Sequence, residues 1–119
     1  MDKIELQNRT FKFSVRIYKM VEKFPKSFGA DMVARQILRS SSSVAANYRA
    51  ACRAKSDADF INKLKTVEEE ADETLFWLEF IQEAGIIIRN LLVNVIKESK
   101  ELVAIFTASV KTSKFKIKK

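Results

Sequence analysis

The stretch that decides the fold is Leu38–Ala54, LRSSSSVAANYRAACRA, in which four consecutive serines lie between two arginines. A serine run of this kind is often a flexible linker between two domains. In a flexible linker, the apolar residues before and after the serines would not be expected to fall on the same face of a helix. Serine is also only roughly a few tenths of a kcal/mol less favourable than alanine in a helix. Wound as a helix, the chain puts apolar and small residues from both sides of the serines on one face: Val33, Ile37, Ser40, Val44, Tyr48 and Ala51. The serines are therefore predicted to lie inside a helix, where small side chains let neighbouring helices approach closely.

Helix-breaking residues are rare and fall at intervals along the rest of the chain. The 119 residues include 2 glycines and 1 proline. Pro25 and Gly29 lie together, Ser56 and Asp59 have the spacing of a capping box, and Gly85 suits a helix C-cap. These positions divide the chain into predicted helices at about residues 8–24, 30–54, 56–84 and 87–110, with a basic tail at 111–119.

The short connections between these segments predict antiparallel neighbours, and hence one all-α domain, an up-down-up-down antiparallel four-helix bundle. The tail, KTSKFKIKK, carries five lysines and no acid, and we expect it to be disordered. No apolar run is long enough to span a membrane, and no signal peptide is visible. The single cysteine cannot form an internal disulfide, which suits a reducing cytosol. We expect a cytoplasmic protein that does not bind membranes.

Arginines gather on the outward face of the second predicted helix. Arg35, Arg39, Arg49 and Arg53 lie within about 80° of one another on a helical wheel. An arginine ridge of this kind can bind phosphate oxygens, and the whole chain carries a net charge of +7. The alternative is a solvated face, or salt bridges to acidic neighbours. The tail lysines can add to a nucleic-acid site, so the predicted nucleic-acid-binding residues are Arg35, Arg39, Arg49, Arg53, Lys111 and Lys114.

The first predicted helix is apolar around an arc of about 220°, about twice what one bundle core requires. A narrow basic stripe of Lys12, Arg16, Lys19 and Lys23 occupies the remainder. The arc fits either a sheltered helix or a helix that buries one face inside and another against a second subunit. On the third helix, two phenylalanines point away from the core stripe into an acidic field. The predicted oligomer interface is Phe13, Ile17, Met20, Phe76 and Phe80.

The acidic residues are concentrated on the third helix. Residues 57–83 contain nine acids and two lysines, a net charge of −7, so the remainder of the chain carries +14. These acids can pair with the basic stripe of the first helix or the arginines of the second, within one subunit or between two. The run EEEADE also has carboxylates spaced to hold Mg²⁺ or Ca²⁺, but a solvated or salt-bridged face is the commoner use of such a run.

The residue types that most enzymes need are missing. The chain has no histidine and 1 cysteine, which excludes Ser–His and Cys–His pairs, zinc clusters and histidine-containing di-iron motifs. No glycine-rich phosphate loop is present. We therefore predict a protein that is not an enzyme and has no cofactor and no metal site.

Several features in order resemble the bacterial 23S rRNA intervening-sequence proteins, over roughly residues 10–110. The features are the turn Phe24-Pro25-Lys26, the stretch QILRSSSS at 36–43, Asn47 in AANY, Phe60 with Leu64, and the acidic segment through Leu78 to Gly85. A related branch is the accessory variability determinant of diversity-generating retroelements, a basic pentamer that associates with nucleic acid and a reverse transcriptase. The resemblance implies a four-helix bundle that assembles as a homopentamer. Some members carry a glutamate after Asn47, whereas this chain reads YRAACRAKS there.

Two functions remain open from the sequence. The first is a homo-oligomeric bundle, with the five subunits that the resemblance implies, that binds RNA or DNA without sequence preference, as electrostatic contacts repeated around a ring would do. The second is a structural adaptor for a protein partner such as a reverse transcriptase, with its charges used for subunit assembly. The partners we expect are thus further copies of the chain, with RNA, DNA or a protein as the ligand.

Overall fold

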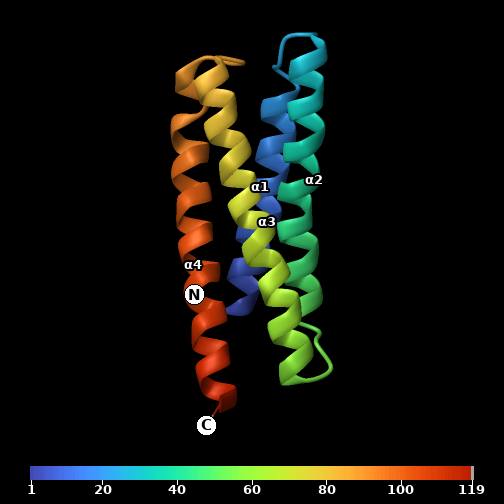
Figure 1. The fold of residues 1–119 in the computed structure, drawn as a ribbon, viewed down its shortest axis with the longest axis vertical. Coiled ribbons are helices and arrows are strands. Elements are labelled where there is room, and N and C mark those ends of the chain that lie inside the picture. Colours follow the sequence, from blue (N-terminus) through green and yellow to red (C-terminus); the bar gives the residue numbers. More distant parts are fainter. Residues whose placement is uncertain (119) are drawn as a thin grey trace.

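The structure, a computed structural model, describes residues 1–118, and the side chains of residues 1–116. Within that range the chain folds into α1 (Lys3–Val21), α2 (Phe28–Ala51), α3 (Asp57–Ala84), the short 3-10 helix η1 (Arg89–Leu91) and α4 (Val93–Lys118). The long helices alternate in direction and form a rod of 50 × 21 × 20 Å (Figure 1). The predicted antiparallel four-helix bundle is confirmed.

The contacts between helices define the corners of the bundle. α2 packs against both α1 and α3, α4 also packs against α1 and α3, and α1 and α4 contact each other least. α1 and α3 therefore occupy diagonally opposite corners, as do α2 and α4. The outward faces of α1 and α3 consequently point away from each other, which matters for assembly.

Short polar side chains fix where the helices begin. The carboxylate of Asp2 accepts a hydrogen bond from the Glu5 amide at 2.8 Å, and the hydroxyl of Ser27 accepts one from the Ala30 amide at 3.1 Å. Ser56 does the same for the Asp59 amide at 3.1 Å, as the sequence predicted. These caps satisfy amides that the first helical turn leaves without partners.

Gly85 ends α3 as expected. Its φ of 67° lies in the left-handed region, which glycine adopts without steric cost. The Ile86 amide donates to the Ile81 carbonyl at 3.2 Å, so the turn also satisfies a free carbonyl of the last helical turn. The chain is thereby redirected toward η1 and α4.

The serine run lies in the middle of α2, and the helix passes through it without a break. Ser40 and Ser41 are completely buried, whereas Ser42 is exposed. The hydroxyls of Ser40 and Ser42 each donate to a carbonyl three residues earlier, at 3.3 and 3.2 Å. The prediction that Leu38–Ala54 is not a hinge is confirmed, because α2 continues to Ala51.

The core follows the predicted stripe on α2, where all six positions from Val33 to Ala51 are buried. On α3 the buried residues include Ile61 and Thr74, whereas the apolar Phe60 and Leu75 are only partly buried. The buried stripe of α3 winds slowly around the helix, because a helix with 3.6 residues per turn does not return to the same face after seven residues.

The bounds of α1 and α4 differ most from the sequence prediction. α1 begins at Lys3 rather than near residue 8, because Asp2 caps it. α4 begins at Val93, after η1, and runs to Lys118. It thus includes residues 111–118, which we expected to be disordered; no glycine or proline interrupts that stretch, and Val110 still extends the buried stripe. Lys119 lies outside the described residues. None of the described helices combines the length and hydropathy that crossing a membrane requires.

Candidate nucleic-acid interface

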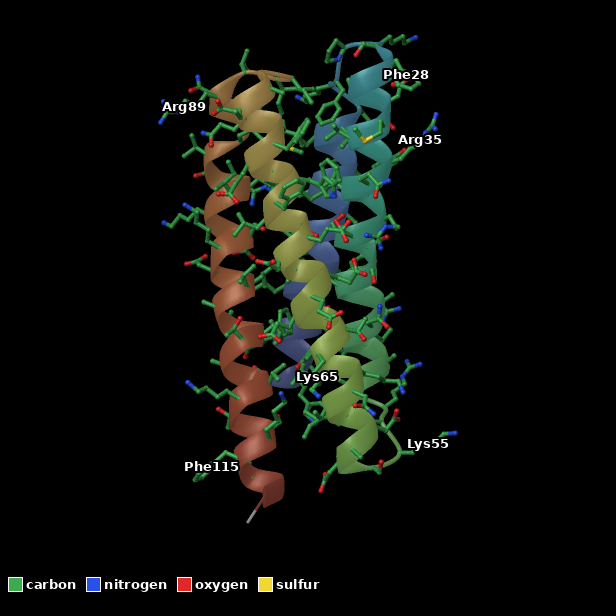
Figure 2. The ribbon with its side chains drawn as sticks, in the orientation of Figure 1. Phe28, Arg35, Lys55, Lys65, Arg89 and Phe115 are labelled. Atoms are coloured by element: carbon green, nitrogen blue, oxygen red, sulfur yellow. The ribbon has the colours of Figure 1, made fainter. Side chains whose placement is uncertain are left out.

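The four predicted arginines of α2 all lie on its solvent-facing side, but they are not equivalent. Arg35 and Arg53 are exposed and take part in no ion pair among the described residues. Arg35, like Lys55 in the following turn, projects away from the bundle on the α2 side (Figure 2). These side chains are free to meet an anion from solution.

Arg39 is committed to α3. Its guanidinium binds Glu70 at 3.2 Å and also pairs with Glu73, and the hydrogen bonds that it donates to the carboxylates of Glu73 and Glu70 raise the pKa of Arg39. Burial raises the pKa of Glu73, but hydrogen bonds from Arg39 and from the Trp77 indole outweigh it, so this pKa is lowered overall. Arg39 therefore supports the salt-bridge alternative, and it is the weakest candidate in the ridge for binding phosphate.

Arg49 points toward α1. Its guanidinium carbon lies 5.9 Å from the centroid of the Phe11 ring, within the range of a cation–π contact. Phe11 is itself half-exposed, and the pair forms part of the surface between α1 and α2. A guanidinium beside an exposed ring is a common arrangement where proteins bind single-stranded nucleic acid.

Lys111 and Lys114 are exposed on the last turns of α4 and form no ion pair among the described residues. They lie on the helix diagonally opposite α2. The structure therefore does not bring the predicted tail lysines onto the arginine ridge. The two groups are separate basic surfaces of one bundle.

The predicted oligomer interface on α1 is wrong. Phe13, Ile17 and Met20 are 3%, 0% and 5% exposed, so they belong to the core of their own subunit. The reason lies in the helix start: Leu6, on the turn that precedes residue 8, is also buried and shares their face. A helix that begins at residue 8 lacks Leu6, and without it the apolar arc is too wide to show which of its sides faces the core.

The apolar residues of α1 that do reach solvent lie on its other side. Phe11, Val15 and Tyr18 are 52%, 37% and 54% exposed and follow one another along the helix. The stripe of Lys12, Arg16, Lys19 and Lys23 runs beside them, is exposed, and forms no ion pair in the described part of the chain. We call these seven residues the α1 outer face. The helical spacing of these four cations in the sequence already indicates a continuous basic stripe, but not whether it binds a ligand.

Part of the α1 outer face borders the seam with α4. Arg16, Lys19 and Lys23 line a groove of about 280 Å³ together with Asn90 and Asn94. One end of the seam is closed by Arg9, which binds Glu98 at 2.6 Å and Glu101 at 3.1 Å. α1 and α4 contact each other less than the other neighbouring long helices do.

On α3, Phe76 and Phe80 are 53% and 40% exposed, as the sequence predicted. With Trp77 they form an aromatic cluster whose ring centroids lie 4.9 to 6.3 Å apart. Acids on neighbouring turns surround them, and we call this set the α3 outer face: Glu69, Asp72, Phe76, Glu79, Phe80 and Glu83. Among the described residues, no group of three or more His, Cys, Asp or Glu side chains is arranged to hold a metal ion.

The fold and these surfaces define a class of protein: an all-α four-helix bundle whose acids are concentrated on one helix. The chain belongs to the 23S rRNA-intervening sequence protein family, which matches residues 2–108. It is also similar to a crystal structure of a protein of unknown function from the S23 ribosomal protein family of Bacteroides thetaiotaomicron. That likeness has a TM-score of 0.84 and 32% identity, and it covers 93% of this chain and 99% of the other. The comparison with curated proteins gave no match.

Proposed function

We propose that the protein is a homo-oligomer that binds RNA or DNA through exposed cations, without sequence specificity. The observation that carries the proposal is the separation of charge. Acids concentrate on the α3 outer face, while exposed cations free of ion pairs within the described chain lie on α1, α2 and α4. A surface of this kind binds a nucleic acid of any base sequence, because its cations replace the counterions of the phosphates and release them into solution.

Assembly follows from the diagonal placement of α1 and α3. The α1 outer face joins an apolar strip to a basic stripe, and the α3 outer face joins an aromatic pair to acids. The two faces are complementary in charge and in apolar character, but they point in opposite directions within one subunit. Complementary faces of this kind favour head-to-tail contacts, which close into a ring when the rotation permits. The family resemblance favours five subunits.

In such a ring, the cations of α1 would meet the α3 outer face of a neighbour, and those of α2 would remain for nucleic acid. Arg35 and Arg53 are the residues we assign to this role, with Arg49 and the lysines of α4 as further contacts. Repetition around a ring would turn one weak contact into useful affinity through avidity. Arg39 is left out because Glu70 and Glu73 already neutralise it.

The test is binding of a fluorescent single-stranded RNA to Arg35→Glu with Arg53→Glu, measured by anisotropy at low salt. We expect at least a tenfold loss of affinity, since each change reverses a charge at a phosphate contact. Lys65→Glu is the matched control, because Lys65 is a cation on α3, away from the ridge (Figure 2). Equal affinity for the double variant and the wild type would contradict the assignment.

The alternative function, an adaptor for a protein partner, is favoured by the same complementary faces. There, the charges would serve subunit assembly alone. High salt would then dissociate the oligomer, and RNA and DNA would bind weakly or not at all. Light scattering at rising salt, together with the RNA measurement, separates the two proposals.

A further inference from the structure

A second surface of the bundle has the form of a small-molecule site. α1 begins short of the end of the rod that α4 and the turn between α2 and α3 reach (Figure 1). The space left there is a cleft of about 700 Å³, lined by residues of all four helices and of that turn. Ligand sites in proteins have volumes of about 300–1,000 Å³, so this cleft is large enough for a nucleotide.

Lysines from two helices line the cleft. Lys3 comes from α1 and Lys116 from α4, whereas Asp57 is the one acid among the described lining residues. Lys55 of the turn also borders the cleft, but its side chain projects away from the bundle (Figure 2). Neither Lys3 nor Lys116 forms an ion pair among the described residues. Two ammonium groups on one cleft suit the several oxygens of a phosphate group.

An aromatic ring lies beside these charges. The ammonium of Lys3 is 5.0 Å from the centroid of the Phe60 ring, and both residues line the cleft. A partly exposed ring supplies a face on which a base can stack, as in sites for single-stranded nucleic acid. Cations alone would suit any anion, but cations next to a ring favour a ligand that has both a phosphate and a base.

We propose that this cleft binds a nucleotide carrying a terminal phosphate, either free or at the end of a nucleic-acid strand. The phosphate meets Lys3 and Lys116, and the base takes the place of the Lys3 ammonium over the Phe60 ring. The strand-end source rests on the proposed function, whereas the free nucleotide does not. The site is distinct from the arginine ridge, because none of Arg35, Arg39, Arg49 and Arg53 lines it.

The chain contains its own reporter for this cleft. Cys52, its 1 cysteine, is partly buried and lines the space. Its alkylation by iodoacetamide, an uncharged reagent that does not compete for the lysines, can be followed by mass spectrometry. The probes are AMP, inorganic phosphate, and a short RNA with either a 5′-phosphate or a 5′-hydroxyl.

We expect AMP at low salt to slow alkylation several-fold, and to do so more than the same concentration of inorganic phosphate. Protection should disappear in Lys3→Ala with Lys116→Ala and persist in Lys97→Ala with Lys100→Ala, which changes exposed lysines of α4 outside the cleft. Phe60→Leu should reduce the advantage of AMP over phosphate. If the 5′-phosphorylated RNA protects better than the 5′-hydroxyl RNA, the strand end is also a ligand.

The inference is overturned if neither AMP nor the 5′-phosphorylated RNA protects Cys52, or if the Lys3/Lys116 variant is protected as well as the wild type. Protection by phosphate equal to that by AMP overturns the nucleotide as the ligand class. The variant Arg35→Glu with Arg53→Glu keeps this test separate from the proposed function. It should lose affinity for long RNA while AMP still protects its Cys52.

Discussion

The hydroxyl of Thr74 on α3 lies 2.9 Å from the hydroxyl of Ser40 on α2, and both side chains are completely buried. Thr74 is also 2.8 Å from the carbonyl of Glu70, and Ser40 is 3.3 Å from that of Ile37. Both hydroxyls therefore have partners within a dry interface, which removes the cost of burying them. Small side chains at this point let the backbones of α2 and α3 come close.

This close approach predicts that enlarging Ser40 is costly. Ser40→Leu should destabilise the protein by roughly 1–3 kcal/mol or more, since extra methylene groups must push two helices apart and Thr74 loses a partner. Ser42→Leu, an identical change two residues along on the exposed side, should alter stability by less than about 0.5 kcal/mol. Urea unfolding followed by circular dichroism gives both values. A similar loss in the two variants would show that the serine run is not a close contact.

The central helix was predictable because its signal is periodic. The apolar phase on either side of the serines located α2 and its buried face without any tertiary information. The core side of α1 was not predictable in the same way, since Phe13 and Phe11 are equally apolar and only packing distinguishes them. The pairing of Arg39 with Glu70 was beyond the sequence as well, because two acidic turns of α3 were within reach of several arginines.

The two glycines of the chain provide a matched pair for testing helix ends. Gly85→Ala should destabilise the protein by about 1–2 kcal/mol, because an alanine at a φ of 67° is strained. Gly29 lies inside the first turn of α2 with open space around it. Gly29→Ala should therefore stabilise the protein by about 0.4–1 kcal/mol. Thermal unfolding measures both. Opposite signs are expected, and a stabilising Gly85→Ala would contradict the left-handed cap.

The ion pair between Arg9 and Glu98 predicts part of the response to acid. The hydrogen bond from Arg9 lowers the pKa of Glu98 against the opposing effect of burial. A carboxyl whose folded pKa is depressed stabilises the protein above its unfolded pKa, and this contribution disappears as the pH falls through the folded pKa. A variant that lacks the Glu98 carboxylate should therefore lose this part of the decrease in unfolding free energy below about pH 5.

Glu98→Gln should cost at most about 1 kcal/mol at neutral pH, since a partly exposed pair is screened by solvent. Its stability should then approach that of the wild type as the pH is lowered toward about 3. Glu79→Gln, which removes an exposed carboxylate from α3, is the control and should show no such convergence. Unfolding curves at several pH values decide the matter; a constant gap between Glu98→Gln and the wild type would count against the pair.

The proposed head-to-tail contact predicts that either outer face can be disabled alone. Phe76→Asp with Phe80→Asp, and Phe11→Asp with Tyr18→Asp, should each convert the oligomer to a folded monomer. Phe13→Asp should instead unfold the subunit, because it buries a charge in the core at a cost of several kcal/mol, roughly 3–5. Light scattering with circular dichroism separates these outcomes. A wild-type mass near 13.7 kDa at micromolar concentration would rule out the oligomer.

The central claim is that this bundle binds nucleic acid through exposed cations, and the salt dependence of binding tests it most directly. The wild-type affinity for a single-stranded RNA is measured by fluorescence anisotropy between about 50 and 200 mM salt. We expect binding at the low end and a loss of about tenfold or more across the range, the fall that neutralising roughly two to three phosphates produces. No binding at the low end, or an affinity that salt does not change, would contradict the account.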